Sequence, residues 1–218
     1  MIVIGAGGFA KELIDILEVK SNYSDKNLFF YDDINHTPDT LYGFKILHDL
    51  NEAEHIFNEI STDFCIGVGS PKYRYLLCNK FENLGGSLKS VISPASAITR
   101  YNVEIGPGTC IMNNSSISNE VKIGKGTLIN SQVLVAHDVK IGDFCDIAPG
   151  VKLSGHCQVG KYVSISTGAI ILPKVKIGQN SFIGAGSVIT TDVPENSVVV
   201  GIVQSRVVNK LTSFEKGL

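Results

Sequence analysis

The chain has 218 residues, 44% of them hydrophobic and 18% charged, so it can bury a core and does not have the composition of a disordered protein. Its net charge of −2 offers no basic surplus for phosphate-backbone contacts, which argues against a nucleic-acid partner. No run of 18 apolar residues occurs, and residues 1–6 resemble a buried strand, so neither a membrane span nor a secretory signal is predicted. Five cysteines without C-x-x-C spacing indicate reduced thiols and a cytoplasmic protein.

The first 90 residues alternate between strand-like and helix-like segments. The predicted strands are residues 2–4, 27–31 and 64–68, and the predicted helices are residues 11–20, 52–60 and 73–84, with Pro71 opening the last helix. Such alternation predicts a parallel sheet built from βαβ units. We therefore expect a Rossmann-like half domain over residues 1–92 and a second domain over residues 93–218.

A glycine-rich turn follows the first predicted strand. Gly5, Gly7 and Ala10 fit the pattern G-x-G-x-x-G/A, and Asp32 follows 22 residues after Ala10, at the end of the next strand. Backbone N–H groups at a helix start bind anions, and an acid at that strand end accepts hydrogen bonds from hydroxyls. A nucleotide sugar satisfies both groups in a half-unit of this size. An NAD-type ligand and a tight turn without a ligand are the alternatives.

The second part of the chain carries a six-residue repeat. Every sixth residue from Ile105 to Ile189 is Ile, Val or Leu, and the residue two places before each is small or β-branched. Both side chains of such a pair point to one face of a short strand. A glycine recurs every 18 residues, directly after a ladder position: Gly106, Gly124, Gly142, Gly160 and Gly178. We expect these glycines to adopt positive φ at one corner of a three-sided parallel β-helix of about 4.7 coils, preceded by a join up to residue 102.

One histidine in this repeat lies beside an acid. His137 precedes Asp138 on a predicted outward turn, an arrangement suited to a general base. Residues 18 apart should stack at about 4.8 Å, which places His156 beneath Asp138 and Gly155 beneath His137. The carboxylate would then lie between two imidazoles. The missing side chain at Gly155 would leave a hollow for a substrate.

Other reactive side chains fit structural roles better. The γ-type carbonic anhydrases use a β-helix to bind zinc, but their site needs three histidines and this repeat has two, so no metal site is predicted. Cys145 and Cys157 occupy the small inward position and are expected to fill the core. We expect His36, His48 and His55 to be solvated.

Several short motifs in a fixed order resemble a known family. They are Gly5-Ala6-Gly7-Gly8, Asp32-Asp33, Gly67-Val68-Gly69, His137-Asp138, Ile141-Gly142, Ala148-Pro149-Gly150, Gly155 and Val200-Gly201. The chain resembles the bacterial nucleotide-sugar acetyltransferases of the hexapeptide-repeat family, which include the UDP-4-amino-sugar and GDP-perosamine N-acetyltransferases and the sialic acid O-acetyltransferases. The resemblance implies an α/β Rossmann-like half domain followed by a left-handed parallel β-helix.

The same resemblance implies an activity. It predicts a homotrimer that binds acetyl-CoA between adjacent β-helices and transfers the acetyl group directly to a nucleotide-linked amino-sugar. His137 would be the base, and Asp138 would raise its basicity. The residues implied in sugar-nucleotide binding are Gly7, Gly8, Phe9, Asp32, Asp33, Gly69 and Asn130. Those implied in acetyl-CoA binding are Asp146, Gly155, Thr167 and Ala185.

Three positions depart from the family pattern. Asp146 stands where many members have a histidine that contacts the acetyl donor, and Phe9 stands where some have histidine. The ending 201–205 lacks the usual proline and lysine. Two alternatives stay open. One is an O-acetyltransferase acting on sialic acid or another sugar, and the other, favoured by Asp146, is a non-enzymatic β-helix that binds a nucleotide sugar.

Overall fold

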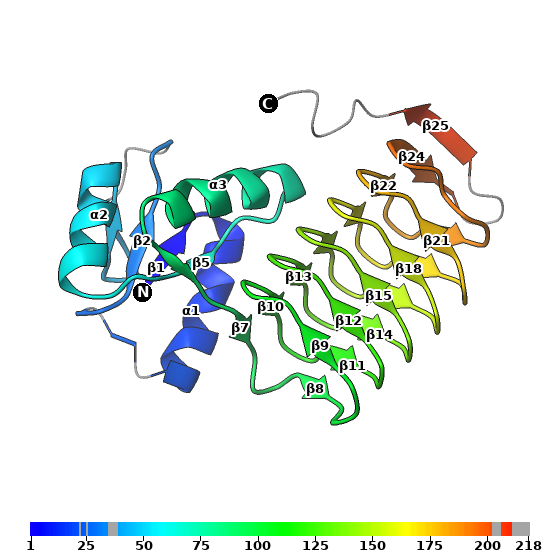
Figure 1. Cartoon of the computed structure of the whole chain (residues 1–218), viewed down its shortest axis with the longest axis horizontal. Helices are drawn as coiled ribbons and strands as arrows, with labels where there is room; N and C mark the ends of the chain where they lie inside the picture. Colours follow the sequence, from blue (N-terminus) through cyan, green and yellow to red (C-terminus); the bar gives the residue numbers. More distant parts are fainter. Residues whose placement is uncertain (22, 25, 35–38, 202–205, 211–218) are drawn as a thin grey trace. The chain divides into compact units, whose positions relative to one another are not determined.

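The computed structural model describes residues 1–21, 23–24, 26–34, 39–201 and 206–210. Contacts divide the chain into two compact units, Met1–Gly69 with Tyr73–Val91 and Ser70–Lys72 with Ile92–Leu218 (Figure 1). None of the helices in the described ranges is both long enough and apolar enough to cross a membrane.

The first unit contains a six-stranded sheet and three helices. The strand order is β3-β4-β2-β1-β5-β6, and all neighbours run parallel except β3 and β4. The strands are β1 (Ile2–Ile4), β2 (Phe29–Tyr31), β3 (Thr40–Leu41), β4 (Phe44–Leu47), β5 (Asp63–Ile66) and β6 (Ser87–Leu88), and the helices are α1 (Gly8–Ser21), α2 (Leu50–Glu59) and α3 (Pro71–Asn83). The predicted strands and helices are confirmed, whereas β3, β4 and β6 were not predicted.

Local signals explain where these helices begin. The Asp49 side chain accepts a hydrogen bond from the backbone N–H of Glu52 and so caps α2. Pro71 is the first residue of α3, where its missing N–H costs no helical hydrogen bond. The apolar face of α1 is buried, and a Cβ at Gly67 would lie 3.0 Å from the Cβ of Ala10. Glycine at 67 therefore lets α1 pack closely against the sheet.

The second unit is a left-handed parallel β-helix with three sheets, as predicted. The eight-stranded sheet contains β7 (Val91–Ile92), β10 (Cys110–Ile111), β13 (Leu128–Ile129), β16 (Asp146–Ile147), β19 (Ser164–Ile165), β22 (Phe182–Ile183), β24 (Ser197–Val200) and β25 (Arg206–Lys210). The six-stranded sheet contains β8 (Ala97–Ile98), β11 (Ser116–Ile117), β14 (Leu134–Val135), β17 (Lys152–Leu153), β20 (Ile170–Ile171) and β23 (Val188–Ile189). The five-stranded sheet contains β9 (Glu104–Ile105), β12 (Lys122–Ile123), β15 (Lys140–Ile141), β18 (Gln158–Val159) and β21 (Lys176–Ile177).

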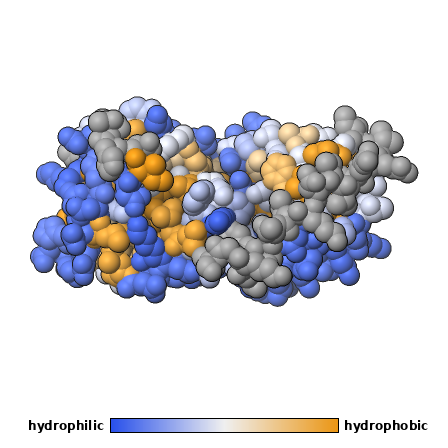
Figure 2. Space-filling view, turned by 90° about the horizontal axis from the view of Figure 1, so that it is seen from above, coloured by the Kyte–Doolittle hydropathy of each residue, from blue (hydrophilic) through white to orange (hydrophobic). Residues whose placement is uncertain are grey.

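The aliphatic ladder forms the core of this unit. Every ladder residue is buried except Ile105, which is half-buried at the N-terminal end. Consecutive coils pair in an 18-residue register, for example Ile123 with Ile141. Because the bulk of the aliphatic side chains points inward, hydrophilic residues cover much of the visible face of this unit in Figure 2.

The expected role of the recurring glycines was wrong. None of the five glycines that follow the ladder has positive φ. A Cβ at Gly142 would instead lie 2.7 Å from backbone atoms of Gly160 and Lys161 in the next coil. These glycines are required because adjacent coils approach closely, and not because of their own conformation. Positive φ occurs elsewhere, at every sixth residue from Asn102 to Gly186.

The 18-residue spacing between paired strands changes at both ends of the ladder. The predicted join before residue 102 contains β8, so the helix begins earlier than expected, and Ile98 pairs with Ile117 in a 19-residue step. At the other end, Ile183 pairs with Val199 in a 16-residue step. The coil therefore loses two residues where β24 turns to pair antiparallel with β25.

Candidate functional site

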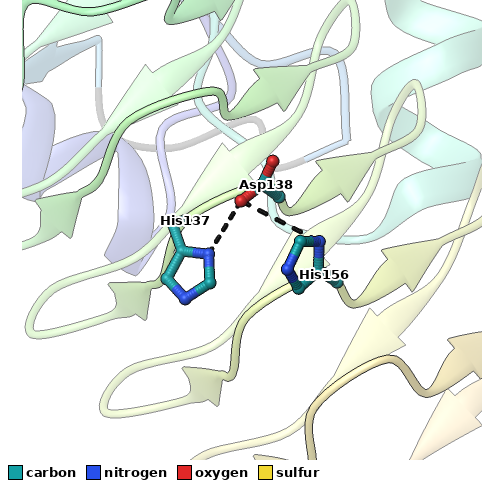
Figure 3. Close-up of side chains that lie close together, drawn as sticks. All are labelled: His137, Asp138 and His156. Atoms are coloured by element: carbon teal, nitrogen blue, oxygen red, sulfur yellow. Dashed lines mark hydrogen bonds and ion pairs between the residues drawn. The ribbon is translucent and has the colours of Figure 1, made fainter.

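His137, Asp138 and His156 meet at one corner of the β-helix, which we call the histidine corner (residues 136–139 and 154–157). It joins the six-stranded sheet to the five-stranded sheet. Asp138 Oδ2 lies 2.7 Å from His137 Nδ1 and 3.8 Å from His156 Nδ1 (Figure 3). The two rings are nearly perpendicular, with centroids 5.1 Å apart. The predicted carboxylate between two imidazoles is therefore confirmed.

The backbone of the repeat fixes this cluster. Asp138 and His156 both have φ of 61°, a left-handed conformation that Asp and His tolerate better than most residues. The N–H of His156 donates to the carbonyl of His137 at 3.0 Å, which locks the two coils in register. All three side chains remain substantially exposed, His137 at 59%. The corner thus presents two imidazoles to solvent from a rigid support.

The short contact to Asp138 decides which nitrogen of His137 is basic. An ionised carboxylate only accepts hydrogen bonds, so Nδ1 of the neutral ring must carry the proton. Nε2 is then the nitrogen able to accept a proton from a substrate. This is the protonation pattern that a general base requires.

The expected hollow above Gly155 is absent. A Cβ at this position would lie 2.7 Å from Cε1 and Nε2 of His137. The imidazole itself occupies the space that a side chain would fill. Gly155 therefore makes room for the ring of His137, and the expectation that this space receives a substrate is corrected.

A second candidate site lies in the first unit, at the carboxyl ends of β1, β2 and β5. The chain leaves β1 to form β2 on one side and returns to form β5 on the other, the arrangement at which open α/β sheets bind ligands. A cavity of about 280 Å³ opens there, lined by Ile4, Gly5, Ala6, Gly7, Tyr31, Asp32, Asp33, Ile34, Val68, Tyr73 and Leu77. The structure thus brings together three of the predicted nucleotide residues, Gly7, Asp32 and Asp33.

The glycines of the first turn have different roles. Gly5 has φ of +106°, and a Cβ there would lie 2.9 Å from Val68 Cγ1, so both conformation and packing require glycine. Gly7 and Gly8 have no atoms within 4 Å of a built Cβ. The space beside them is open, as close approach of a ligand to the backbone requires.

A hydrogen-bond network surrounds Asp33 and was not predicted from the sequence. Its Oδ2 accepts hydrogen bonds from Tyr31 Oη and Lys80 Nζ, each at 2.9 Å. Burial acts to raise the pKa of the Asp33 carboxyl, but the bonds from Lys80 and Tyr31 outweigh it and lower that pKa. Burial, followed by the hydrogen bond to Asp33, raises the pKa of Tyr31. Tyr31 directly precedes the predicted acid pair, but no sequence signal links Lys80 to it.

Two further residues support this cavity. Arg74 is fully buried on α3 and donates from Nη1 to the carbonyls of Ile66 (3.2 Å) and Val68 (2.7 Å), which holds the end of β5. His48 is partly buried, with Nδ1 2.9 Å from the carbonyl oxygen of Asp32. The expectation of a solvated side chain was therefore wrong for His48. His55 is exposed on α2.

The remaining predicted residues lie apart from these clusters. Phe9 is half-buried in α1, and Gly69 lies between β5 and α3; neither lines the cavity. Asp146 lies on β16 and is partly exposed. Residues 202–205 and His36 lie outside the described residues.

Thr167 and Ala185 are exposed on consecutive coils, at what we call the glycine corner (residues 148–151, 166–169 and 184–187). This corner joins the eight-stranded sheet to the six-stranded sheet. Asn130 belongs to the same row of turns, and its Oδ1 accepts the N–H of Ser131. These residues thus occupy a different corner from His137.

Cys145 and Cys157 belong to the core, as predicted. All five cysteines lie in the described part of the chain, where they are buried and form no disulfide. Burial raises the pKa of Cys145 to about 12, and its Sγ contacts the carbonyl oxygen of Gly160 at 3.0 Å. Cys157 packs in the same apolar cluster. Neither thiol is placed to act as a nucleophile.

Two protein families match the chain. Residues 1–81 match the PglD N-terminal domain, and residues 120–155 and 156–191 match the bacterial transferase hexapeptide family. No curated protein matches the chain.

Solved structures match nearly the whole chain. WeeI from Acinetobacter baumannii is 29% identical, with 95% of this chain and 98% of that chain covered and a TM-score of 0.87. The acetyltransferase domain of PglB from Neisseria gonorrhoeae, in complex with acetyl coenzyme A, is 27% identical over 95% of this chain and 98% of that chain, with a TM-score of 0.84. A variant of perosamine N-acetyltransferase from Caulobacter crescentus, with CoA and GDP-perosamine, shares the fold at 24% identity, 96% coverage of both chains and a TM-score of 0.85.

Proposed function

We propose that this chain, which matches the bacterial transferase hexapeptide family and a solved acetyltransferase domain, transfers an acetyl group from acetyl-CoA to the amino group of a nucleotide-linked 4-amino-sugar. The observation that carries this proposal is the histidine corner. It holds the exposed imidazole of His137, whose Nδ1 lies 2.7 Å from Asp138 Oδ2. In the proposed reaction, this imidazole is the base that removes a proton from the attacking amine.

The proposed mechanism is direct transfer. The sugar nitrogen attacks the thioester carbonyl while Nε2 of His137 accepts its proton, and Asp138 stabilises the imidazolium that forms. Backbone N–H groups stabilise the oxyanion. CoA then leaves as the thiolate, which takes up the proton held by the His137 imidazolium. Because the scaffold holds both substrates together, no acyl-enzyme is required. The buried, high-pKa Cys145 supports a route without a protein thiol.

The cavity of the first unit is proposed to bind the nucleotide. The open backbone beside Gly7 and Gly8 suits a diphosphate at the start of α1, and Asp32 suits a hydroxyl or a base N–H. Phe9 and Gly69 remain proposed contacts. Asn130 remains the residue proposed to face the sugar.

We further propose that the enzyme is a homotrimer. Within one chain, His137 is at the histidine corner, whereas Thr167 and Ala185 are at the glycine corner. A groove formed by the histidine corner of one subunit and the glycine corner of its neighbour would unite them around acetyl-CoA, with Asp146 and Gly155 as further proposed contacts. A monomer by light scattering at micromolar concentration would contradict this arrangement. The reduced cysteines favour the cytoplasm as the site of the reaction.

A substrate panel tests the activity. Purified protein is incubated with acetyl-CoA and either a sialic acid or one of a set of UDP-, GDP- and dTDP-linked 4-amino-sugars. Products are identified by mass spectrometry, and binding of each sugar is measured by calorimetry. We expect one amino-sugar to gain an acetyl group on nitrogen. Acetylation of a sialic acid hydroxyl would establish the O-acetyltransferase instead. Binding of a nucleotide sugar without any transfer would contradict an enzymatic role.

A further inference from the structure

The histidine corner also has the composition of a transition-metal site. Nδ1 of His137, Nδ1 of His156 and Oδ2 of Asp138 point toward one another from two consecutive coils (Figure 3). One ligand atom from each residue lies within 4.8 Å of the others. We propose that this cluster binds one Zn²⁺-class ion and that the bound ion switches off acetyl transfer.

The ligand set matches this class of metal. Two imidazoles and one carboxylate with an open fourth position are typical of Zn²⁺ bound by three protein ligands. Two ligand atoms at about 2.1 Å from a tetrahedral ion are about 3.4 Å apart. The observed separations from Asp138 Oδ2, 2.7 and 3.8 Å, lie on either side of that value. All three side chains are exposed enough to adjust by small rotations, with 59% of the His137 side chain, 40% of Asp138 and 51% of His156 accessible.

Binding at this point removes the base by moving a proton. A neutral imidazole carries one N–H, which lies on Nδ1 of His137 while that nitrogen contacts Asp138. When Nδ1 coordinates a metal instead, the ring proton occupies Nε2. Nε2 is the atom that must accept the amine proton, so the metal-bound ring cannot act as the base. The inhibition rests on the proposed function, whereas the binding step does not.

Binding is tested without substrates. Metal-free protein is titrated with Co²⁺, whose visible absorption reports nitrogen and oxygen ligation, and with Zn²⁺ by calorimetry. We expect one ion per chain, and at least tenfold weaker binding in His156→Ala. His55→Ala, which removes an exposed histidine from α2, should bind as the wild type does. Equal affinity in wild type and His156→Ala would overturn the proposed site.

Inhibition is tested separately, on the acetylated sugar found by the substrate panel. Product is measured by chromatography, because Zn²⁺ binds the thiol of released CoA and distorts thiol assays. Each variant is compared with its own metal-free rate. We expect Zn²⁺ to lower kcat with little effect on the KM for acetyl-CoA, a chelator to restore the rate, and His156→Ala to need at least tenfold more metal for half inhibition. Binding without loss of rate, or an increased rate, would overturn the inhibitory role. If no sugar is acetylated, the binding titration still decides whether the metal site exists.

Discussion

The two units assemble their sites in different ways. In the β-helix, Asp138 and His156 are 18 residues apart in the chain and adjacent in space, because the repeat stacks one coil on the next. In the α/β unit, Asp33 and Lys80 are 47 residues apart and meet only because α3 packs against the end of β2. Strict repetition converts sequence spacing into distance. In a mixed α/β unit, spacing in the sequence does not set the distance between side chains. Its side-chain networks depend on how the helices pack against the sheet.

The largest expected effect follows from His137→Ala. Loss of the base should lower kcat by roughly 10²–10⁴, with little change in the KM for acetyl-CoA. Asp138→Asn should cost less, because the proton acceptor remains, and His156→Ala should cost least. Steady-state kinetics against His55→Ala as the matched histidine control measures this order. Wild-type kcat in His137→Ala would show that the amine needs no protein base.

The close approach of coils predicts a large effect on stability. Gly142→Ala places a Cβ 2.7 Å from the backbone of the next coil and should destabilise the β-helix by about 3 kcal/mol. Gly168→Ala is the matched control. It has φ of +70° but open space around its Cβ, so it should cost only about 1–2 kcal/mol. Denaturant unfolding measures the free energy of unfolding of both variants. A larger loss for Gly168→Ala would contradict the conclusion that the ladder glycines are required by close packing of the coils.

Gly155→Ala separates activity from stability at the histidine corner. The added Cβ meets the ring of His137, a side chain that can rotate away, instead of rigid backbone. We expect a decrease in kcat of about tenfold, because the base leaves its productive geometry, with a Tm close to that of the wild type. A strong loss of Tm with normal kcat would show that the ring position is structural only.

Asp32→Ala tests whether the nucleotide sugar and acetyl-CoA bind at separate sites. Loss of the acid beside the cavity should weaken nucleotide-sugar binding by about 10- to 150-fold, the range of one hydrogen bond to a charged group. Acetyl-CoA binding should not change. Calorimetry with each ligand measures both, with Asp15→Ala on the exposed face of α1 as the control. Equal losses for the two ligands would contradict separate sites.

The smallest effect is a change in acid sensitivity. Because its folded pKa is lowered, Asp33 stabilises the fold at pH values above its unfolded pKa, and this contribution disappears as pH falls through the folded pKa. Asp33→Asn removes it, so Tm should fall less steeply between about pH 5 and pH 2 than in the wild type. Thermal unfolding across that range measures the slope. Asp15→Asn should leave the slope unchanged, and parallel curves for Asp33→Asn and the wild type would show that the network has no energetic role.

The periodic features of the chain were predictable from residue spacing alone. The aliphatic ladder, its 18-residue coil and the position of Asp138 between two histidines follow from a repeat whose side chains alternate and whose coils stack. The glycine turn and the acids after β2 were likewise recognisable, because such residues have a fixed place in βαβ units.

The remaining features of the fold and of the two candidate sites depend on tertiary packing. Spacing placed Gly155 under His137 but could not show that the ring itself fills the gap, since a rotamer depends on its neighbours. The recurrence of the ladder glycines was visible in the sequence. The reason for it, the close approach of backbone atoms in adjacent coils, is visible only in the three-dimensional structure. The Asp33–Lys80 pair, the buried Arg74 and the 16-residue closing step likewise arise from contacts between segments with no common period. Sequence patterns report periodicity and local conformation, whereas contacts between non-repeating segments depend on the three-dimensional packing of the whole unit.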